Sequence, residues 1–108
     1  MSSSGRENLV FKALADPRRR AMLDFLKEDR RTTGEVCDRF PKIDRCTVML
    51  HLRVLEKAGL IAVKREGRVR WNYLDIAPLQ RIYERWISRY AAPSAALLLR
   101  MKKGIEES

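Results

Sequence analysis

Side chains that could bind a metal ion or act as nucleophiles are few in this chain of 108 residues. Two cysteines, Cys37 and Cys46, and one histidine, His51, are present. A structural zinc site uses four ligands that are mostly cysteine or histidine, so these three residues cannot complete one by themselves. No pattern of catalytic partners surrounds His51 in the sequence. We therefore predict that the protein is not an enzyme and has no cofactor and no metal site.

Arginine and lysine are the abundant residues that could bind a partner. There are 23 of them against 14 acidic residues, which gives a net charge of +9. The excess is uneven, because residues 17–31 contain six basic and three acidic side chains and residues 44–74 contain seven and three. Residues 1–16 and 32–43 are each balanced. This distribution favours an anionic partner, with nucleic acid ahead of an anionic membrane surface.

The sequence contains no segment that would place the chain in a membrane. Its longest nearly apolar stretch, Ala91–Leu99, is interrupted by Pro93 and is far shorter than the ~20 residues that a membrane span needs. The first residues lack the apolar core of a secretory signal, and two cysteines are typical of a reducing compartment. We expect a cytoplasmic protein without a membrane partner.

Capping signals divide much of the chain into helices. Asp16 precedes Pro17, Thr32 and Glu35 have the spacing of a capping box, and Asp44 precedes a further apolar repeat. The apolar spacing then predicts helices over residues 7–15, 17–27, 32–40, 45–58, 76–90 and 94–103.

The apolar period changes to two after Gly59. Residues 60–65 and 69–74 alternate on either side of a turn at residues 66–68, which predicts a β-hairpin with a basic tip. A short helix, a break at Pro41, a longer helix and a two-stranded ribbon are typical of a winged helix-turn-helix. We therefore predict a mainly α fold with a β-hairpin wing. The expected parts are a flexible tail (1–6), the winged domain (7–92), and a C-terminal helix and tail (93–108).

Three segments carry a resemblance to a known family. Leu14–Arg19 reads Leu-Ala-Asp-Pro-Arg-Arg, Val48–Ile61 contains His-Leu and ends in Ala-Gly-Leu-Ile, and Gly67-Arg68 precedes Trp71 and Tyr73. In this order and spacing, the segments resemble the ArsR/SmtB-type winged helix-turn-helix repressors, over residues 9–90. The resemblance implies a homodimer that binds double-stranded DNA. The contact between the two chains would be formed largely by the first and the long C-terminal helices.

The resemblance also indicates which residues would contact DNA. Residues 45–58 would be the recognition helix in the major groove, and residues 64–70 would be the wing beside it. With the charge pattern, this assigns DNA contacts to Arg18, Arg19, Arg45, Thr47, Leu50, His51, Arg53, Lys64, Arg65, Arg68 and Arg70. Dimer contacts are assigned to Leu9, Val10, Leu79, Tyr83, Trp86 and Tyr90.

Two residues of the expected recognition helix have two interpretations each. Relatives commonly carry a polar residue in place of Leu50, so either base recognition relies on apolar contact there or Leu50 packs against a neighbour. A lone histidine such as His51 packs between helices or bonds a phosphate. The aromatic stripe of Trp86 and Tyr90 favours a dimer contact over a ligand pocket.

Two alternatives to a repressor without a metal switch stay open. Metal sensors of the family carry a Cys-Xaa-Cys-type cluster before the recognition helix, or His, Asp and Glu ligands on the last helix. Here Cys37 stands alone, and the last helix has only Glu84 besides the capping Asp75. Cys37 with Cys46 would still suit a thiol-based sensor of arsenite or oxidants. The charge also suits a winged-helix module that binds an acidic protein, and no inducer is identified.

Overall fold

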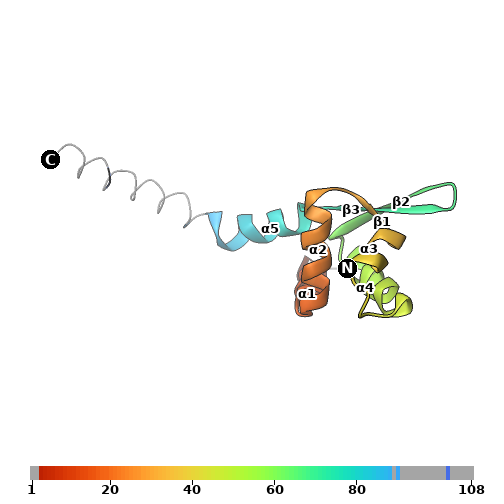
Figure 1. Ribbon diagram of the computed structural model, residues 1–108. Helices are drawn as coiled ribbons and strands as arrows, with labels where there is room; N and C mark the ends of the chain where they lie inside the picture. Colours follow the sequence, from red (N-terminus) through yellow and green to blue (C-terminus); the bar gives the residue numbers. More distant parts are fainter. Residues whose placement is uncertain (1–2, 89, 91–101, 103–108) are drawn as a thin grey trace. The chain divides into compact units, whose positions relative to one another are not determined.

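Side-chain caps begin three consecutive helices at the predicted positions. The computed structural model describes residues 3–88, 90 and 102, and in it Asp16, Thr32 and Asp44 each accept a backbone N–H bond from the first turn of the next helix. Thr32 and Glu35 form the complete capping box. The elements are α1 (Ser3–Leu14), α2 (Pro17–Glu28), β1 (Arg31–Thr32), α3 (Thr33–Arg39), α4 (Arg45–Lys57), β2 (Ile61–Glu66), β3 (Val69–Leu74) and α5 (Ala77–Trp86) (Figure 1).

The outermost helices differ from the predicted ones at their ends. α1 begins at Ser3, so residues 3–6 are helical and the prediction of a flexible tail is wrong there. The first turn is polar and offers no apolar spacing that would reveal it. α5 ends at Trp86 rather than near Tyr90. The helix predicted over residues 94–103 lies outside the described residues, apart from Lys102.

A three-stranded antiparallel sheet replaces the predicted two-stranded ribbon. Its strand order is β1-β3-β2, and β1 pairs Arg31 with Asn72 and Thr32 with Trp71. β1 was not predicted, because two residues are too few to display a period of two. β2 and β3 pair from Ile61–Leu74 to Glu66–Val69 around a two-residue turn in which Gly67 has a φ of 63°. A positive φ at this position favours glycine in a hairpin turn.

The helix-turn-helix and the sheet share one core. Its buried side chains come from α1, α2, α3, α4 and the start of β2, which explains why the apolar stripes of all four helices are needed. α4 ends at Lys57, and Gly59 just after its C-cap has a φ of 79°; a Cβ there would lie 3.4 Å from Pro78 Cγ. The core residues are Val10, Ala13, Met22, Leu23, Leu26, Val36, Val48, Leu52, Leu55, Leu60 and Ile61.

The chain consists of two compact units, residues 1–78 and residues 79–108. The first contains the helix-turn-helix and the hairpin, whose tip extends beyond the helices (Figure 1). This unit confirms the predicted mainly α fold with a β-hairpin wing. Among the described residues, no helix is both long and apolar enough to cross a bilayer.

Candidate nucleic-acid interface

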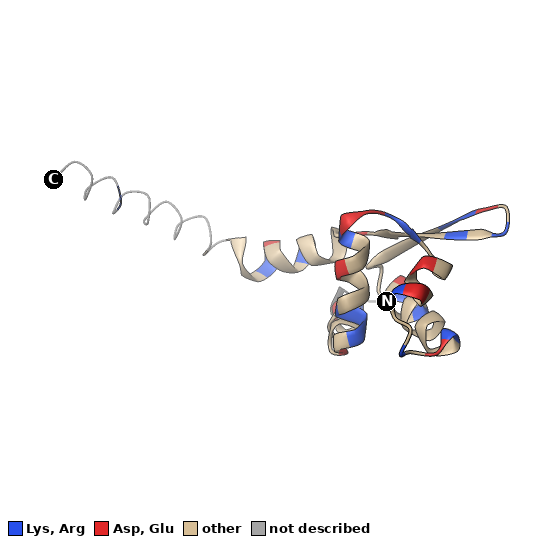
Figure 2. Cartoon of the chain, in the orientation of Figure 1, with Lys and Arg blue, Asp and Glu red and all other residues tan. Residues whose placement is uncertain are grey.

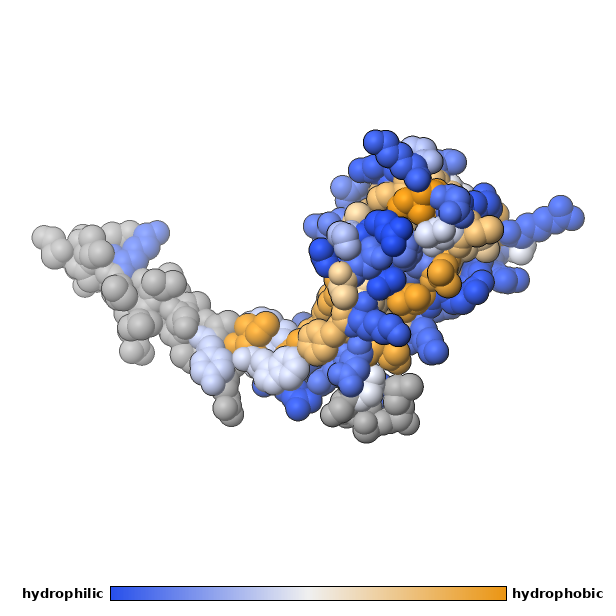
Figure 3. Space-filling view, turned by 90° about the horizontal axis from the view of Figure 1, so that it is seen from below, coloured by the Kyte–Doolittle hydropathy of each residue, from blue (hydrophilic) through white to orange (hydrophobic). Residues whose placement is uncertain are grey.

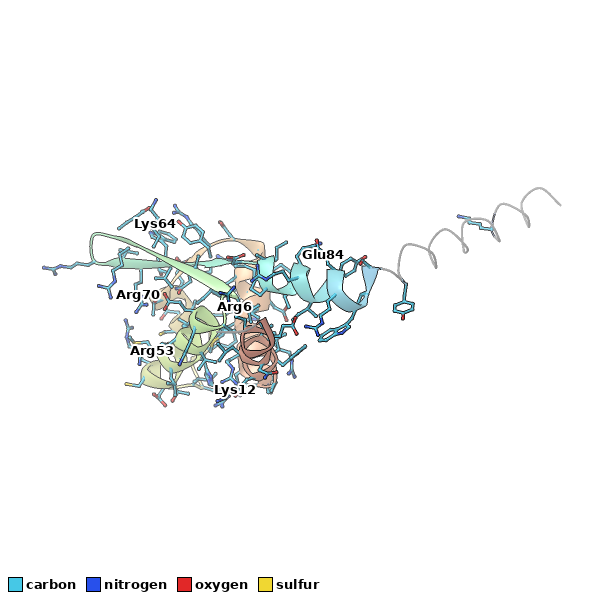
Figure 4. The ribbon with its side chains drawn as sticks, turned by 180° about the vertical axis from the view of Figure 1, so that it is seen from behind. Arg6, Lys12, Arg53, Lys64, Arg70 and Glu84 are labelled. Carbon is cyan, nitrogen blue, oxygen red and sulfur yellow. The ribbon has the colours of Figure 1, made fainter. Side chains whose placement is uncertain are left out.

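One face of α4 is buried in the core and the other is exposed to solvent. Val48, Leu52 and Leu55 lie in the core and hold the helix against the domain. On the other face, Cys46, Leu50 and Arg53 are exposed, and the Arg53 side chain points away from the helix (Figure 4). α4 therefore presents the Arg53 guanidinium, with an exposed leucine about one turn before it, to whatever approaches that face, and Arg45 is exposed at the start of the helix.

The N-terminal cap of α4 limits what Thr47 can do. Asp44 accepts bonds from the Thr47 amide at 3.0 Å and from the Thr47 hydroxyl at 2.7 Å. The same bonds lower the pKa of the Asp44 carboxyl. Because the hydroxyl proton is directed to Asp44, Thr47 has no donor left for a phosphate oxygen. The DNA contact predicted for Thr47 would therefore use its methyl group rather than a bond donated by its hydroxyl.

A groove lies between the helix-turn-helix and the hairpin. It has a volume of about 430 Å³, and four arginines from two separate elements line it: Arg45 at the start of α4, and Arg65, Arg68 and Arg70 in the hairpin. Its remaining lining residues are Thr32, Thr33, Gly34, Met49, Gly67 and Val69. Figure 2 shows the basic residues along the hairpin and near the start of α4. Within residues 3–88, no hydrogen bond or ion pair engages the guanidinium of Arg45, Arg65 or Arg68. Three unpaired cations beside one groove favour an anionic ligand.

The hairpin divides its basic residues between two faces. Arg65 pairs in register with Arg70, and Arg70 forms an ion pair with Glu56 of α4 at 3.6 Å. Lys64 precedes Arg65 and therefore points to the opposite face, away from α4 (Figure 4). Its ammonium lies 4.0 Å from Glu66. The structure thus brings Arg65 and Arg70 to the groove and leaves Lys64, predicted to join them, on the other side.

The outward face of the hairpin holds a cation–π cluster that the sequence analysis missed. The Arg30 guanidinium lies 4.0 Å from the ring centroid of Trp71 and donates to the Tyr73 hydroxyl at 2.9 Å. It also lies 3.9 Å from Glu66. The alternation of Trp71 and Tyr73 was the available signal, since it places both rings on one face. This cluster covers the back of the wing and leaves the other face to the groove.

The arginines at the start of α2 serve the fold rather than the groove. Arg19 donates to the carbonyl oxygens of Ala13 at 2.7 Å and Lys12 at 3.0 Å, and Arg20 donates to Leu14 at 2.5 Å. These carbonyls belong to the last turn of α1, which has no intrahelical donors for them. The Arg19 side chain is only 15% exposed, so its predicted contact with DNA is wrong. Arg18 is bound by Asp16 through two bonds, and the pairing holds the pKa of Asp16 below its usual range.

His51 is also a structural residue. It is 4% exposed, and its Nδ1 accepts a bond from Arg19 at 3.3 Å. The ring proton therefore lies on Nε2, which is buried and has no hydrogen-bond partner in the described part of the chain. Burial and the charge of Arg18 lower the pKa of His51, while Asp16 opposes the shift. Of its two interpretations, packing between helices is correct, and a contact with DNA is wrong.

The predicted dimer residues fall into two groups. Val10 is 2% exposed and belongs to the core, so it is not available to a partner. Tyr83, Trp86 and Tyr90 are 40–65% exposed in the second unit, and Leu79 is half-buried. Leu9 is half-buried on α1. These aromatic rings are therefore available to a partner, and Figure 3 shows hydrophobic residues at the surface among hydrophilic ones.

The cysteines do not form a metal centre with other side chains that the structure describes. Cys37 is half-buried on α3, and Cys46 is exposed in the first turn of α4. Throughout the described residues, no cluster of three or more Cys, His, Asp and Glu side chains has the geometry to hold a metal ion.

Sequence comparisons relate this chain to known regulators. Residues 14–64 match a family model described as a helix-turn-helix domain. The transcriptional repressor SdpR of Bacillus subtilis is 37% identical over 73 residues, which are 68% of this chain and 80% of SdpR.

Solved structures give the same result. The ArsR family transcriptional regulator RHA00566 has a TM-score of 0.69 and 30% identity, over 95% of this chain and 98% of that one. The winged helix-turn-helix DNA-binding domain of Mb0332 from Mycobacterium bovis, a possible ArsR-family regulator described as homodimeric, has a TM-score of 0.63 and 25% identity. The match spans 80% of this chain and 85% of the Mb0332 chain. With its own helix-turn-helix, wing and basic groove, this chain belongs to the ArsR-type winged helix-turn-helix family of DNA-binding transcriptional regulators.

Proposed function

We propose that this protein is a homodimeric repressor that binds a palindromic DNA operator through α4 and the wing. The observation that carries the proposal is the groove in which Arg45, Arg65 and Arg68 converge without partners among the described residues. Phosphate oxygens satisfy such guanidinium groups by charge-assisted hydrogen bonds. Regulation of transcription takes place on the chromosome, so we expect the protein in the cytoplasm.

The exposed face of α4 would lie in the major groove. Arg45 and Arg53 can each donate two hydrogen bonds to the acceptors of a guanine, which is the commonest specific contact between a protein and DNA. Arg65 and Arg68 would contact the phosphates beside that site. Arg70 would act through α4, because its ion pair with Glu56 links the wing to the recognition helix.

The dimer would present two such helices to one face of the duplex. The exposed aromatic residues of α5, Tyr83 and Trp86, would bury their apolar surface against a second copy. The homodimeric state of Mb0332 supports this arrangement. Two recognition helices would then address half-sites roughly 34–36 Å apart, one turn of the DNA helix. Repression rather than activation is supported by the similarity to SdpR.

The experiment is a selection from random duplexes with the full-length protein, followed by salt titration of the selected duplex. If Arg65 and Arg68 of both protomers each neutralise a phosphate, log Kd should change with log salt with a slope of about 4. Sedimentation should give one dimer per duplex. A slope near zero, with no sequence enriched, would contradict the proposal and favour the protein-binding module.

A further inference from the structure

Leu50 is an exposed apolar side chain in the middle of the recognition helix. It is 54% exposed, whereas Val48 and Leu52 on either side of it are 0% and 6% exposed. Burial of α4 in the core therefore does not require a leucine at this position. Of the two sequence interpretations of Leu50, packing against a neighbour within the domain does not account for this exposure, and a contact outside the domain is left.

The surroundings of Leu50 identify the kind of partner. Arg53 follows Leu50 by three residues and is therefore its neighbour on the exposed face of α4, while Arg45 in the first turn lines the groove at the wing with three further arginines. An apolar protein partner would need a larger contiguous apolar patch than one leucine beside a guanidinium group. Charge complementarity instead selects a polyanion, and the occupant that fits a helix with these charges is the major groove of duplex DNA.

The chemistry of the major groove limits which group of the DNA Leu50 can contact. Base edges there present hydrogen-bond donors and acceptors, and the apolar group that they present is the C5-methyl of thymine. 5-Methylcytosine presents the same methyl group. Leu50 can satisfy neither donors nor acceptors, and the hydroxyl of Thr47, one turn earlier, is bound to Asp44. The middle of α4 is therefore suited to an apolar contact and unsuited to a hydrogen-bonded one.

We propose that Leu50 reads a C5-methylated pyrimidine in each operator half-site, beside the base pair contacted by Arg53. This inference rests on the proposed DNA-binding function and adds a specificity determinant to it. Sequence preference at that position comes from burial of one methyl group against the Leu50 side chain. Burial of a single methyl group corresponds to about a fourfold gain in affinity, and two half-sites together to about fifteenfold.

The test removes single methyl groups from a selected duplex. The full-length protein is used to select a duplex from a random library, and each thymine is then replaced in turn by deoxyuridine, which removes only the methyl group. We expect one thymine per half-site at which the replacement weakens binding about fourfold. A second arm places cytosine or 5-methylcytosine at that position. Methylation of the cytosine should recover affinity if the methyl group is what Leu50 recognises.

Variants of Leu50 separate this contact from a general effect on DNA affinity. With Leu50→Ala, the thymine and deoxyuridine duplexes should bind equally, whereas Leu50→Met should keep the difference because methionine retains an apolar contact. The inference is overturned if no thymine shows the effect, or if Leu50→Ala discriminates as strongly as the unaltered chain. In that case, salt-dependent binding of the selected duplex would leave the proposed function intact. A failure to select any duplex would overturn both.

Discussion

Replacement of Arg19 by methionine distinguishes its structural role from the DNA contact that the sequence suggested. Arg19 donates to the carbonyl oxygens of Ala13 and Lys12 at 2.7 and 3.0 Å and to Nδ1 of His51 at 3.3 Å. Methionine keeps the aliphatic stem and removes the guanidinium, so all three acceptors lose the bond from Arg19, and Lys12 O keeps only its bond from the Ala15 amide. Hydrogen bonds to charged groups contribute about 1.5–3 kcal/mol, and the Lys12 bond is exposed to water. With the two partly buried bonds at the low end of that range, the free energy of unfolding should fall by about 3 kcal/mol.

Urea unfolding followed by far-UV circular dichroism measures this loss. It should be repeated at several protein concentrations, because association of two chains adds to the apparent stability. A loss of this size would lower Tm by roughly 12–24 °C in a domain of about 100 residues. Arg18→Met is the matched control, since Arg18 is exposed and, among the described residues, its guanidinium is bound by the neighbouring Asp16 alone, so its loss should be much smaller. If Arg19→Met unfolds like the unaltered chain and yet loses DNA affinity, our structural assignment of Arg19 is refuted.

Four further predictions follow from the interface and the core. Asn72→Leu should lower the free energy of unfolding by about 1–3 kcal/mol, measured in urea, because the buried amide donates to Arg31 O and Thr33 Oγ1 and leucine cannot. Burial lowers the pKa of His51 below its ordinary 6.5, so the unfolded chain binds a proton that the folded chain does not. Stability should therefore be full above about pH 6.5 and decrease as the pH falls, and His51→Gln should flatten that dependence in urea titrations at pH 7 and 5. Arg68→Ala should weaken binding to all duplexes and reduce the salt slope by about 2, whereas Arg45→Ala should relax the selected sequence; equal effects of both would contradict the division into phosphate and base contacts. Arsenite should leave DNA affinity unchanged in a fluorescence titration, because neither cysteine belongs to a cluster of three or more metal-ligating side chains among the described residues, and a loss that Cys46→Ser abolishes would favour the thiol-sensing alternative.

Local chemistry made the helix-turn-helix predictable. The caps at Asp16, Thr32 and Asp44 depend on residues within three positions of each other, so the sequence displays them directly. The change of period after Gly59 revealed the hairpin for the same reason. β1 was missed because its two residues become a strand only through pairing with β3, which lies about forty residues further along the chain.

The errors at the candidate interface have a different origin. The sequence shows that Arg19 is basic, but it does not show that the carbonyls ending α1 accept hydrogen bonds from its side chain. The structural role of His51 was hidden for the same reason, because its partner Arg19 is 32 residues away in the sequence. Lys64 was a recoverable error. The period of two already places it on the opposite face from Arg65, and the wing should have been divided by face rather than counted as one basic segment.

The junction of the wing with the helix-turn-helix affects how fast DNA can be bound. Asn72 fastens β3 to Arg31 in β1 and to Thr33 at the start of α3, so the base of the hairpin is fixed before any duplex arrives. Ordering a mobile side chain at an interface costs about 0.5–1.5 kcal/mol, and a segment fixed in advance avoids that entropy loss on association. Encounter between protein and operator is then governed by diffusion and orientation, with no folding step of the wing to wait for.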